Sequence, residues 1–281
     1  MLGHIKLLFC QAFSDWNDHD APTMGAALAY YSVLSLAPLL VVAVCIAGMV
    51  YGQKAASGEI LYQVRGLVGT GGAEVIQDIL KNAKSPFTGT IASAIGILTL
   101  LFGASGVFKA LRDSLNRIWD VKGAAGSGLW AAIRRETLTF GMVLGIGFLL
   151  LVSLVVSALI TAVGKFFEGR VPVTFWQFFN VMISLVVITL LFALIYRVVP
   201  STRIEWRDVW VGAFVTAVLF TTGKYLIGLY LGKASVGSAY GAAGSLVAVL
   251  VWVYYSAQIF LLGAEFTHVY AKMEGSRSRK R

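Results

Sequence analysis

Charged residues are scarce in this chain. Of its 281 residues only 13% are charged, 58% are hydrophobic, and the mean hydropathy is +0.78. Soluble domains usually contain about 25% charged residues. The shortage of charge excludes an ordinary soluble domain, and the excess of apolar residues predicts an integral membrane protein.

Cysteine and histidine are also rare. Cys10 and Cys45 lie in an amphipathic stretch and in an apolar run, which excludes a disulfide framework. The three histidines, His4, His19 and His268, lie in different regions of the chain. Metal-dependent RNA hydrolysis needs clustered His, Asp or Glu ligands, so the sequence predicts no metal site and no ribonuclease activity.

One short stretch, DWNDHD at residues 15–20, does combine three acids with a histidine. No second cluster of such residues accompanies it in the sequence. Pro22 and Thr23 follow it directly, as at the start of a helix, where acids interact favourably with the helix dipole. We therefore expect a capping or interfacial role for this stretch.

Motifs for nucleotide binding and for hydrolysis are missing. The sequence contains no GxxxxGK[ST] loop, no GxSxG motif and no zinc-ligand motif. We expect no catalytic residues, no cofactor and no direct use of ATP, so the chain is not predicted to be an enzyme.

Long apolar runs are the dominant feature of the chain. A membrane helix needs about 20 mostly apolar residues, and six runs meet this requirement: 24–50, 88–108, 138–163, 175–199, 208–231 and 243–270. The sequence therefore predicts an all-α, polytopic membrane protein with six transmembrane helices. Prolines mark several edges of these runs, namely Pro22, Pro86, Pro172 and Pro200.

The basic residues predict the orientation, because lysine and arginine accumulate in cytoplasmic loops. Of the 23 lysines and arginines, 15 fall on the side of the two termini and 8 on the other side. We expect both termini in the cytoplasm of a bacterial inner membrane. This topology explains the net charge of +9 without nucleic acid as a partner.

Amphipathic segments flank the predicted spans. Residues 1–23 form an interfacial segment whose apolar residues recur at spacings of three and four, namely Leu2, Ile5, Phe9, Phe13 and Trp16. The domain 24–270 includes an external loop, 51–87, with two short amphipathic helices, and a cytoplasmic loop, 109–137. Residues 271–281 form a basic cytoplasmic tail.

Polar residues gather on one face of the last predicted helix. At about 100° per residue, a single face carries Tyr254, Gln258, Glu265, His268 and Lys272. Such a face should point into the bundle or at water. Glu265 is either a structural anchor or ion pair, or a residue that handles a substrate or ion.

Two other spans carry polar faces. In the second span the residues recur at spacings of four, three and four: Ser105, Lys109, Arg112 and Asn116. In the first span, Tyr31, Ser35 and Pro38 share a face. Because Lys109 and Arg112 lie at the same predicted depth as Glu265, they are our first choice for its partners.

Lys224 and the glycine-rich segment 232–245 have two interpretations each. Lys224 either snorkels to the outer interface or faces an anionic substrate group. The segment around Tyr240 either allows close helix packing or breaks a helix for substrate binding, as transporters do.

Four stretches together resemble the BrkB/YihY family of bacterial inner-membrane proteins, formerly labelled as a ribonuclease family: AALAYYSVLSLAPLL, SGVFKALRDSLNRIW, YRVVP followed by WRDVWVGAFVTAVLF, and YGAAGSLVAVLVWVYYSAQIFLLGAEF. The resemblance spans roughly residues 20–270. It implies six membrane helices, both ends in the cytoplasm and a link to virulence. The family's polar positions correspond to Tyr30, Tyr31, Ser35, Pro38, Asn116, Pro200, Tyr240 and Glu265.

Three classes of function remain. We expect a transporter or flippase-like protein that moves a lipid, an envelope precursor or a small solute, with membrane lipids as partners and an anionic lipid or solute as the cargo. The alternative is a structural scaffold of the cell envelope whose polar faces only lock helices together. A membrane-embedded enzyme would need a catalytic constellation, which the sequence does not show. A homo-oligomer is compatible with either of the first two classes.

Overall fold

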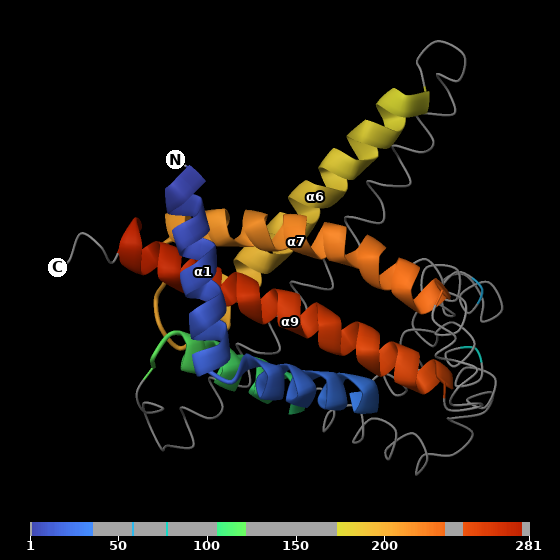
Figure 1. The fold of residues 1–281 in the computed structure, drawn as a ribbon, viewed down its shortest axis with the longest axis horizontal. Helices are drawn as coiled ribbons and strands as arrows, with labels where there is room; N and C mark the ends of the chain where they lie inside the picture. The colour runs from blue at the N-terminus through green and yellow to red at the C-terminus, as the bar shows by residue number, and fades with distance from the viewer. Residues whose placement is uncertain are drawn as a thin grey trace, which may run out of the picture. The chain divides into compact units, whose positions relative to one another are not determined.

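Helices account for nearly all of the structure, a computed structural model that describes residues 2–35, 58, 77, 106–121, 173–233 and 244–276. The main elements are α1 (Leu2–Asp18), α6 (Val173–Val198), α7 (Trp206–Lys233) and α9 (Gly244–Met273) (Figure 1). Residues 21–35 and 106–118 are also helical. The described part of the chain contains no strand, which confirms the predicted all-α class.

Three of the described helices are long and apolar enough to cross a bilayer. Their apolar stretches are Val181–Val198, Trp206–Ile227 and Leu246–Met273. They correspond to the predicted spans 175–199, 208–231 and 243–270. The first predicted span is described only as far as residue 35. The spans 88–108, apart from its last three residues, and 138–163 lie outside the described residues, as do Tyr240 and nearly all of the external loop.

The chain divides into two compact units. The first comprises Met1–His19, Leu115–Thr221 and Leu262–Arg281, and the second comprises Asp20–Ser114 and Thr222–Leu261. Helices α7 and α9 each contribute one part to each unit.

In the first unit, α1 lies across the C-terminal part of α9 (Figure 1). Leu8 and Ala12 are buried against Phe266 and Val269, and the ring of Phe9 lies 4.9 Å from that of Phe266, centroid to centroid. The predicted N-terminal helix is confirmed. Of its predicted apolar face, Phe9 lies in this contact.

The packed face of α1 is rotated relative to the predicted stripe. Ala12 takes the buried position in this contact, and the Phe13 side chain, which belongs to the predicted interfacial stripe, is 60% exposed. The small Ala12 side chain lets the two helix backbones approach, which an aromatic ring at that position would prevent.

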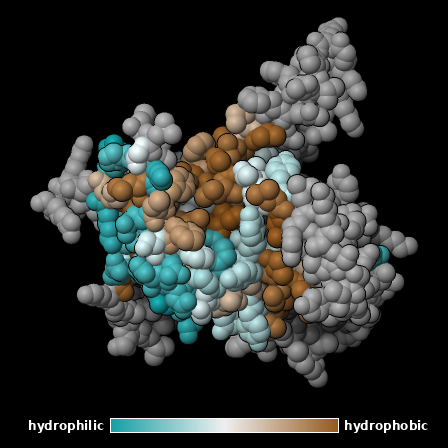
Figure 2. All heavy atoms as spheres, viewed as in Figure 1, coloured by the Kyte–Doolittle hydropathy of each residue, from teal (hydrophilic) through white to brown (hydrophobic). Residues whose placement is uncertain are grey.

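Hydrophilic residues gather over α1, and hydrophobic residues gather over α6 (Figure 2).

Close contacts hold α6, α7 and α9 together within the same unit. The Tyr196 hydroxyl of α6 lies 3.1 Å from the Thr216 hydroxyl of α7, and both side chains are buried. Gly263 of α9 faces these two hydroxyls, and Gly212 of α7 faces Thr267 of α9. A β-carbon at either glycine would overlap its neighbours. Glycine at these positions therefore allows α7 and α9 to pack closely.

The end of α9 is attached to the start of α7. Asp208, in the first turn of α7, is fully buried. Its Oδ2 accepts hydrogen bonds from the backbone N–H of Ser276 at 3.2 Å and from the Ser276 hydroxyl at 2.5 Å. An acid in the first turn also faces the positive end of the helix dipole. This contact fixes where α9 ends.

In the second unit, helix 21–35 packs against α9 and against helix 106–118. The Gln258 side chain of α9 contacts Gly25, and the Tyr31 ring contacts Gly106. Tyr255 and Ile259 of α9 pack against Gly223 of α7. Gln258 is thus turned toward protein, as predicted from the polar face of the last helix.

Candidate functional site

Six ionisable residues meet in the first unit, at the end of α1, at the turn after helix 106–118 and on the last turns of α9. We call them the polar cluster: Asp15, His19, Asp120, Glu265, His268 and Lys272. They come from three segments that lie far apart in the sequence. Three of the six, Glu265, His268 and Lys272, were predicted to share a face.

Helical spacing explains how α9 contributes to the cluster. Glu265, His268 and Lys272 follow one another at intervals of three and four residues, so they project from the same face. Glu265 and His268 have no exposed surface, while Lys272 is exposed. The predicted inward orientation of this face is therefore confirmed at Glu265 and His268.

Glu265 is hydrogen-bonded to His19. Its Oε1 lies 2.7 Å from His19 Nδ1. An ionised carboxylate can only accept, so His19 Nδ1–H donates to it. The structure thus shows His19 as a partner of Glu265 within the first unit, and pairing with our first choice, Lys109 or Arg112, stays a prediction. Those two residues lie on helix 106–118 in the other unit.

The second oxygen of Glu265 is in a different state. Oε2 is buried and has no hydrogen-bond partner among the residues that the structure describes. A buried carboxylate oxygen without a partner is costly, because it loses its hydration and gains nothing in return. This half of the Glu265 side chain is available to bind a cationic or proton-donating group.

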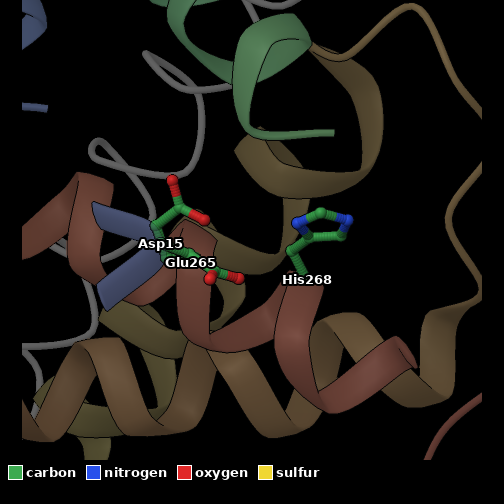
Figure 3. A group of neighbouring side chains, drawn as sticks. All are labelled: Asp15, Glu265 and His268. Atoms are coloured by element: carbon green, nitrogen blue, oxygen red, sulfur yellow. The ribbon is translucent and has the colours of Figure 1, made fainter. Parts of the chain in front are cut away.

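Asp15 and His268 lie beside that carboxylate. Asp15 comes from the last turn of α1, and Glu265 and His268 come from α9 (Figure 3). One potential ligand atom from each of the three lies within 4.8 Å of the others. We call these three residues the donor triad. Two ionised carboxylates at that separation repel by about 3 to 4 kcal/mol at an effective dielectric constant of about 20, so the triad favours a cation.

The stretch DWNDHD therefore does more than cap a helix. Its capping role is supported, since Thr23 donates a hydrogen bond to Asp20, just before helix 21–35. The sequence contains no second cluster of such residues, but the fold brings Asp15 and His19 to Glu265 and His268, which are single residues of α9. The sequence offered two signals of this contact. The stretch with acids and a histidine lies beside the first predicted span, and the last predicted span carries the carboxylate Glu265.

Asp120 joins the cluster from an unusual backbone position. Helix 106–118 ends with the Val121 N–H bonded to the Asn116 carbonyl and the Asp120 N–H bonded to the Arg117 carbonyl. This pair of bonds is a Schellman motif, which places Asp120 at a site that usually holds glycine. Its φ is 52°. Aspartate and asparagine adopt this left-handed conformation more readily than most other residues with a β-carbon.

The Asp120 carboxylate bridges both histidines and the lysine of the cluster. Lys272 Nζ lies 3.2 Å from Oδ2, and the Nε2 atoms of His19 and His268 each lie 3.9 Å from a carboxylate oxygen. The Trp119 ring packs on His268, with 4.9 Å between centroids. Partial burial opposes ionisation of Asp120, but the hydrogen bond and charge of Lys272, with the two histidines, hold its pKa below the usual value.

A lowered pKa makes the Asp120 contribution pH-dependent. The stabilisation is present above the ordinary value of 3.8 and is lost as the pH falls through the lowered pKa. Asp120→Asn keeps a residue that tolerates the backbone conformation but removes the charge. We expect it to lower stability at neutral pH by about 0.5 kcal/mol, the value of an exposed pair. Thermal unfolding in detergent measures this difference.

The difference in stability between Asp120→Asn and the parent chain should become smaller as the pH falls below 3.8. Lys272→Gln should show the same narrowing, since it removes the other half of the pair. A difference that stays constant over this pH range would mean that the Asp120 charge does not contribute.

Asn116, predicted on the polar face of the second span, has a structural contact in the first unit. Its Oδ1 accepts from the Ser201 backbone N–H at 2.7 Å, and its Nδ2 donates to the Ser201 hydroxyl at 3.2 Å. It therefore fixes the turn after α6 and does not join the polar cluster.

The remaining predicted residues belong to the second unit. Gln258 Nε2 approaches the Pro22 carbonyl at 3.5 Å, and Ser35 donates to the Ser32 carbonyl of its own helix. Tyr31, Arg112 and Tyr254 are half-buried, and Lys109 and Lys224 are exposed. The structure thus brings Glu265 together with Asp15, His19 and Asp120, which were not among the predicted partners of Glu265.

The three long apolar helices define the class of this protein, a multi-pass helical membrane protein. The chain belongs to the family described as virulence factor BrkB, whose pattern matches residues 12–281. The predicted family resemblance is thereby confirmed.

Named relatives support the same class. The chain is 27% identical over 278 residues to a UPF0761 membrane protein of Mannheimia succiniciproducens, covering 97% of this chain and 92% of that protein. It is 30% identical over 267 residues to a UPF0761 membrane protein of Pseudoalteromonas atlantica, covering 93% and 85%. A Bacillus subtilis relative, 23% identical with coverage of 91% and 92%, is named as the ribonuclease-like protein YfkH. No solved structure matches the chain.

Proposed function

We propose that this chain is a transporter or flippase-like protein of the bacterial inner membrane. It moves a lipid, an envelope precursor or a small solute, spans the membrane six times and keeps both termini in the cytoplasm. The observation that carries the proposal is the position of Glu265. This carboxylate is fully buried within the apolar helix segment Leu246–Met273 and belongs to a cluster of six ionisable residues.

Ionisable groups within membrane helices are expensive to bury, and they mark routes for substrates and ions. A purely structural helix could fill the position of Glu265 with an apolar residue at no desolvation cost. The polar face also continues along α9 to Gln258, whose Oε1 is buried without a hydrogen-bond partner in the described residues. Buried polar groups without hydrogen-bond partners fit a path for a substrate or an ion better than they fit a purely structural contact between helices.

A scaffold is the second candidate, and specific contacts favour it. Asn116 with Ser201 and Asp208 with Ser276 each join two segments through hydrogen bonds that have an evident structural role. If the polar cluster works in the same way, purified protein moves no lipid or solute. The ribonuclease-like name of one relative does not enter the proposal, which includes no catalytic step.

Reconstituted vesicles test the proposal. The parent chain is reconstituted in vesicles that contain a fluorescent anionic phospholipid. It should speed the movement of this probe between the two leaflets. Chemical quenching of the probe in the outer leaflet measures the rate. Glu265→Gln should reduce the rate at least about tenfold, since a buried charged partner is removed at a cost of 1.4 kcal/mol or more. A labelled small anion provides a second cargo.

Glu274→Gln is the matched control. Glu274 also contacts a histidine across α1 and α9, His4, at 2.8 Å, but the Glu274 and His4 side chains are 39% and 69% exposed. This variant should transport like the parent. Equal rates for Glu265→Gln and the parent, with both proteins folded and inserted, would remove Glu265 from transport. No movement of either probe by the parent would favour the scaffold.

A further inference from the structure

We propose that the donor triad, Asp15, Glu265 and His268, binds a divalent first-row transition metal ion. The first basis is geometry. One oxygen or nitrogen atom from each side chain lies within 4.8 Å of the other two. Atoms this close can approach a common centre through small side-chain rotations. Figure 3 shows that the three come from α1 and α9, which are fixed relative to each other by the packing of Phe9 on Phe266.

The second basis is the unused oxygen of Glu265. The residue has no exposed surface, and Oε2 has no hydrogen-bond partner in the part of the chain that the structure describes. Such a group needs a partner that the described side chains do not supply. A metal ion bound by the triad would be that partner.

The charges of the polar cluster also favour a cation. Three carboxylates, Asp15, Asp120 and Glu265, face a single lysine, Lys272. If the imidazoles of His19 and His268 are neutral, the three carboxylates and the lysine leave two negative charges in a partly desolvated site. A divalent cation would balance them.

The donor types select the class of metal. Carboxylate oxygens alone would suit Mg²⁺ or Ca²⁺, whereas an imidazole beside two carboxylates suits Mn²⁺, Fe²⁺, Co²⁺ or Zn²⁺. Asp15 also accepts a hydrogen bond from Gln11 at 2.7 Å, which holds its carboxylate near the end of α1. The site should therefore prefer a transition metal over Mg²⁺.

His19 would orient the site without binding the ion. Its Nδ1–H donates to Glu265 Oε1, on the other side of the carboxylate from the unused Oε2. Partners of this kind fix the orientation of a ligand, and their removal typically weakens metal affinity about 10- to 100-fold. His19 is thus a positioning residue, distinct from the triad.

Metal binding does not depend on the proposed transport. A bound ion could fasten α1 to α9 in a scaffold or occupy the cargo route of a transporter. The experiment therefore measures binding alone and gives a result whether or not the protein moves a lipid.

Cobalt provides the test. Purified full-length protein in detergent is treated with EDTA, freed of the chelator and titrated with Co²⁺, and the visible absorption bands of the bound ion are recorded. We expect saturable binding of one ion per chain, competition by Zn²⁺, and little competition by Mg²⁺. Glu265→Gln and Asp15→Asn should weaken binding more than about 100-fold, and His19→Asn should weaken it about tenfold.

The control again uses the exposed carboxylate–histidine contact of the same two helices. Glu274→Gln should bind Co²⁺ like the parent, because the His4–Glu274 pair lies at the surface. If Glu265→Gln does not fold, Asp15→Asn decides, since Asp15 is only half-buried on α1. Absence of saturable binding, or equal binding by the parent and Asp15→Asn, would overturn the proposal. So would a loss in Glu274→Gln equal to that in the triad variants.

Discussion

His19→Ala is expected to lower the free energy of unfolding by about 3 kcal/mol, because it leaves a buried carboxylate without its hydrogen-bond donor. His19 is the hydrogen-bond donor to Glu265 Oε1, and Glu265 has no exposed surface. Its other oxygen has no partner among the described residues. Without His19, the carboxylate would be buried with neither oxygen bonded by the described side chains. The cost arises from Glu265, not from the lost histidine itself.

Thermal unfolding in detergent, with EDTA present, measures this effect as a lower midpoint. The double variant His19→Ala with Glu265→Leu should recover much of the loss, because replacing both partners of a buried polar pair removes the unsatisfied group. His4→Ala is the control, since its partner Glu274 is partly exposed and can be hydrated. A double variant less stable than His19→Ala would show that Glu265 is not the source of the cost.

The second large effect is expected at the contact between α7 and α9. Gly263→Ala should lower the free energy of unfolding by about 2 kcal/mol, a typical cost of overpacking. A β-carbon at this position would overlap the Thr216 hydroxyl and approach the Tyr196 hydroxyl, both of which are buried. These two hydroxyls are 3.1 Å apart, so neither can move freely without losing that contact. The midpoint of thermal unfolding measures the loss.

Gly3→Ala is the matched control for this substitution. A β-carbon at Gly3 meets no atom within 4 Å, and the residue lies on α1, where alanine favours the helix. Gly3→Ala should therefore leave stability unchanged or slightly raised. If Gly263→Ala were as stable as the parent, α7 and α9 would not pack as closely as the structure shows.

The bounds of the later helices were predictable from the sequence. The run predicted at 175–199 is α6, Val173–Val198, because Pro172 precedes it and Pro200 follows its last turn. The runs predicted at 208–231 and 243–270 are α7 and α9, with ends displaced by one to three residues. The length of an apolar run and the positions of prolines are local features of the sequence, so they indicate the helix ends without knowledge of the fold.

The partner of Glu265 was not predictable in the same way. Lys109 and Arg112 were chosen because their charge and their depth suited a carboxylate, but depth does not determine which segment crosses α9. His19 reaches Glu265 because α1 packs on α9 through Leu8 and Ala12. No local pattern indicates a contact between residues 246 positions apart. Asp120 was missed for another reason, since only the backbone shows that it occupies a left-handed position at the end of a helix.

The contact between His19 and Glu265 can form only late in the synthesis of the chain. The two residues are 246 positions apart, so at about 5 to 20 residues per second the ribosome needs about 12 to 50 s to make Glu265 after His19. During that interval α1 has no α9 to pack against, and Leu8 and Ala12 have not found their partners. The first helix to leave the ribosome is therefore among the last to reach its final place, and a chain truncated before Leu262 would never assemble the polar cluster.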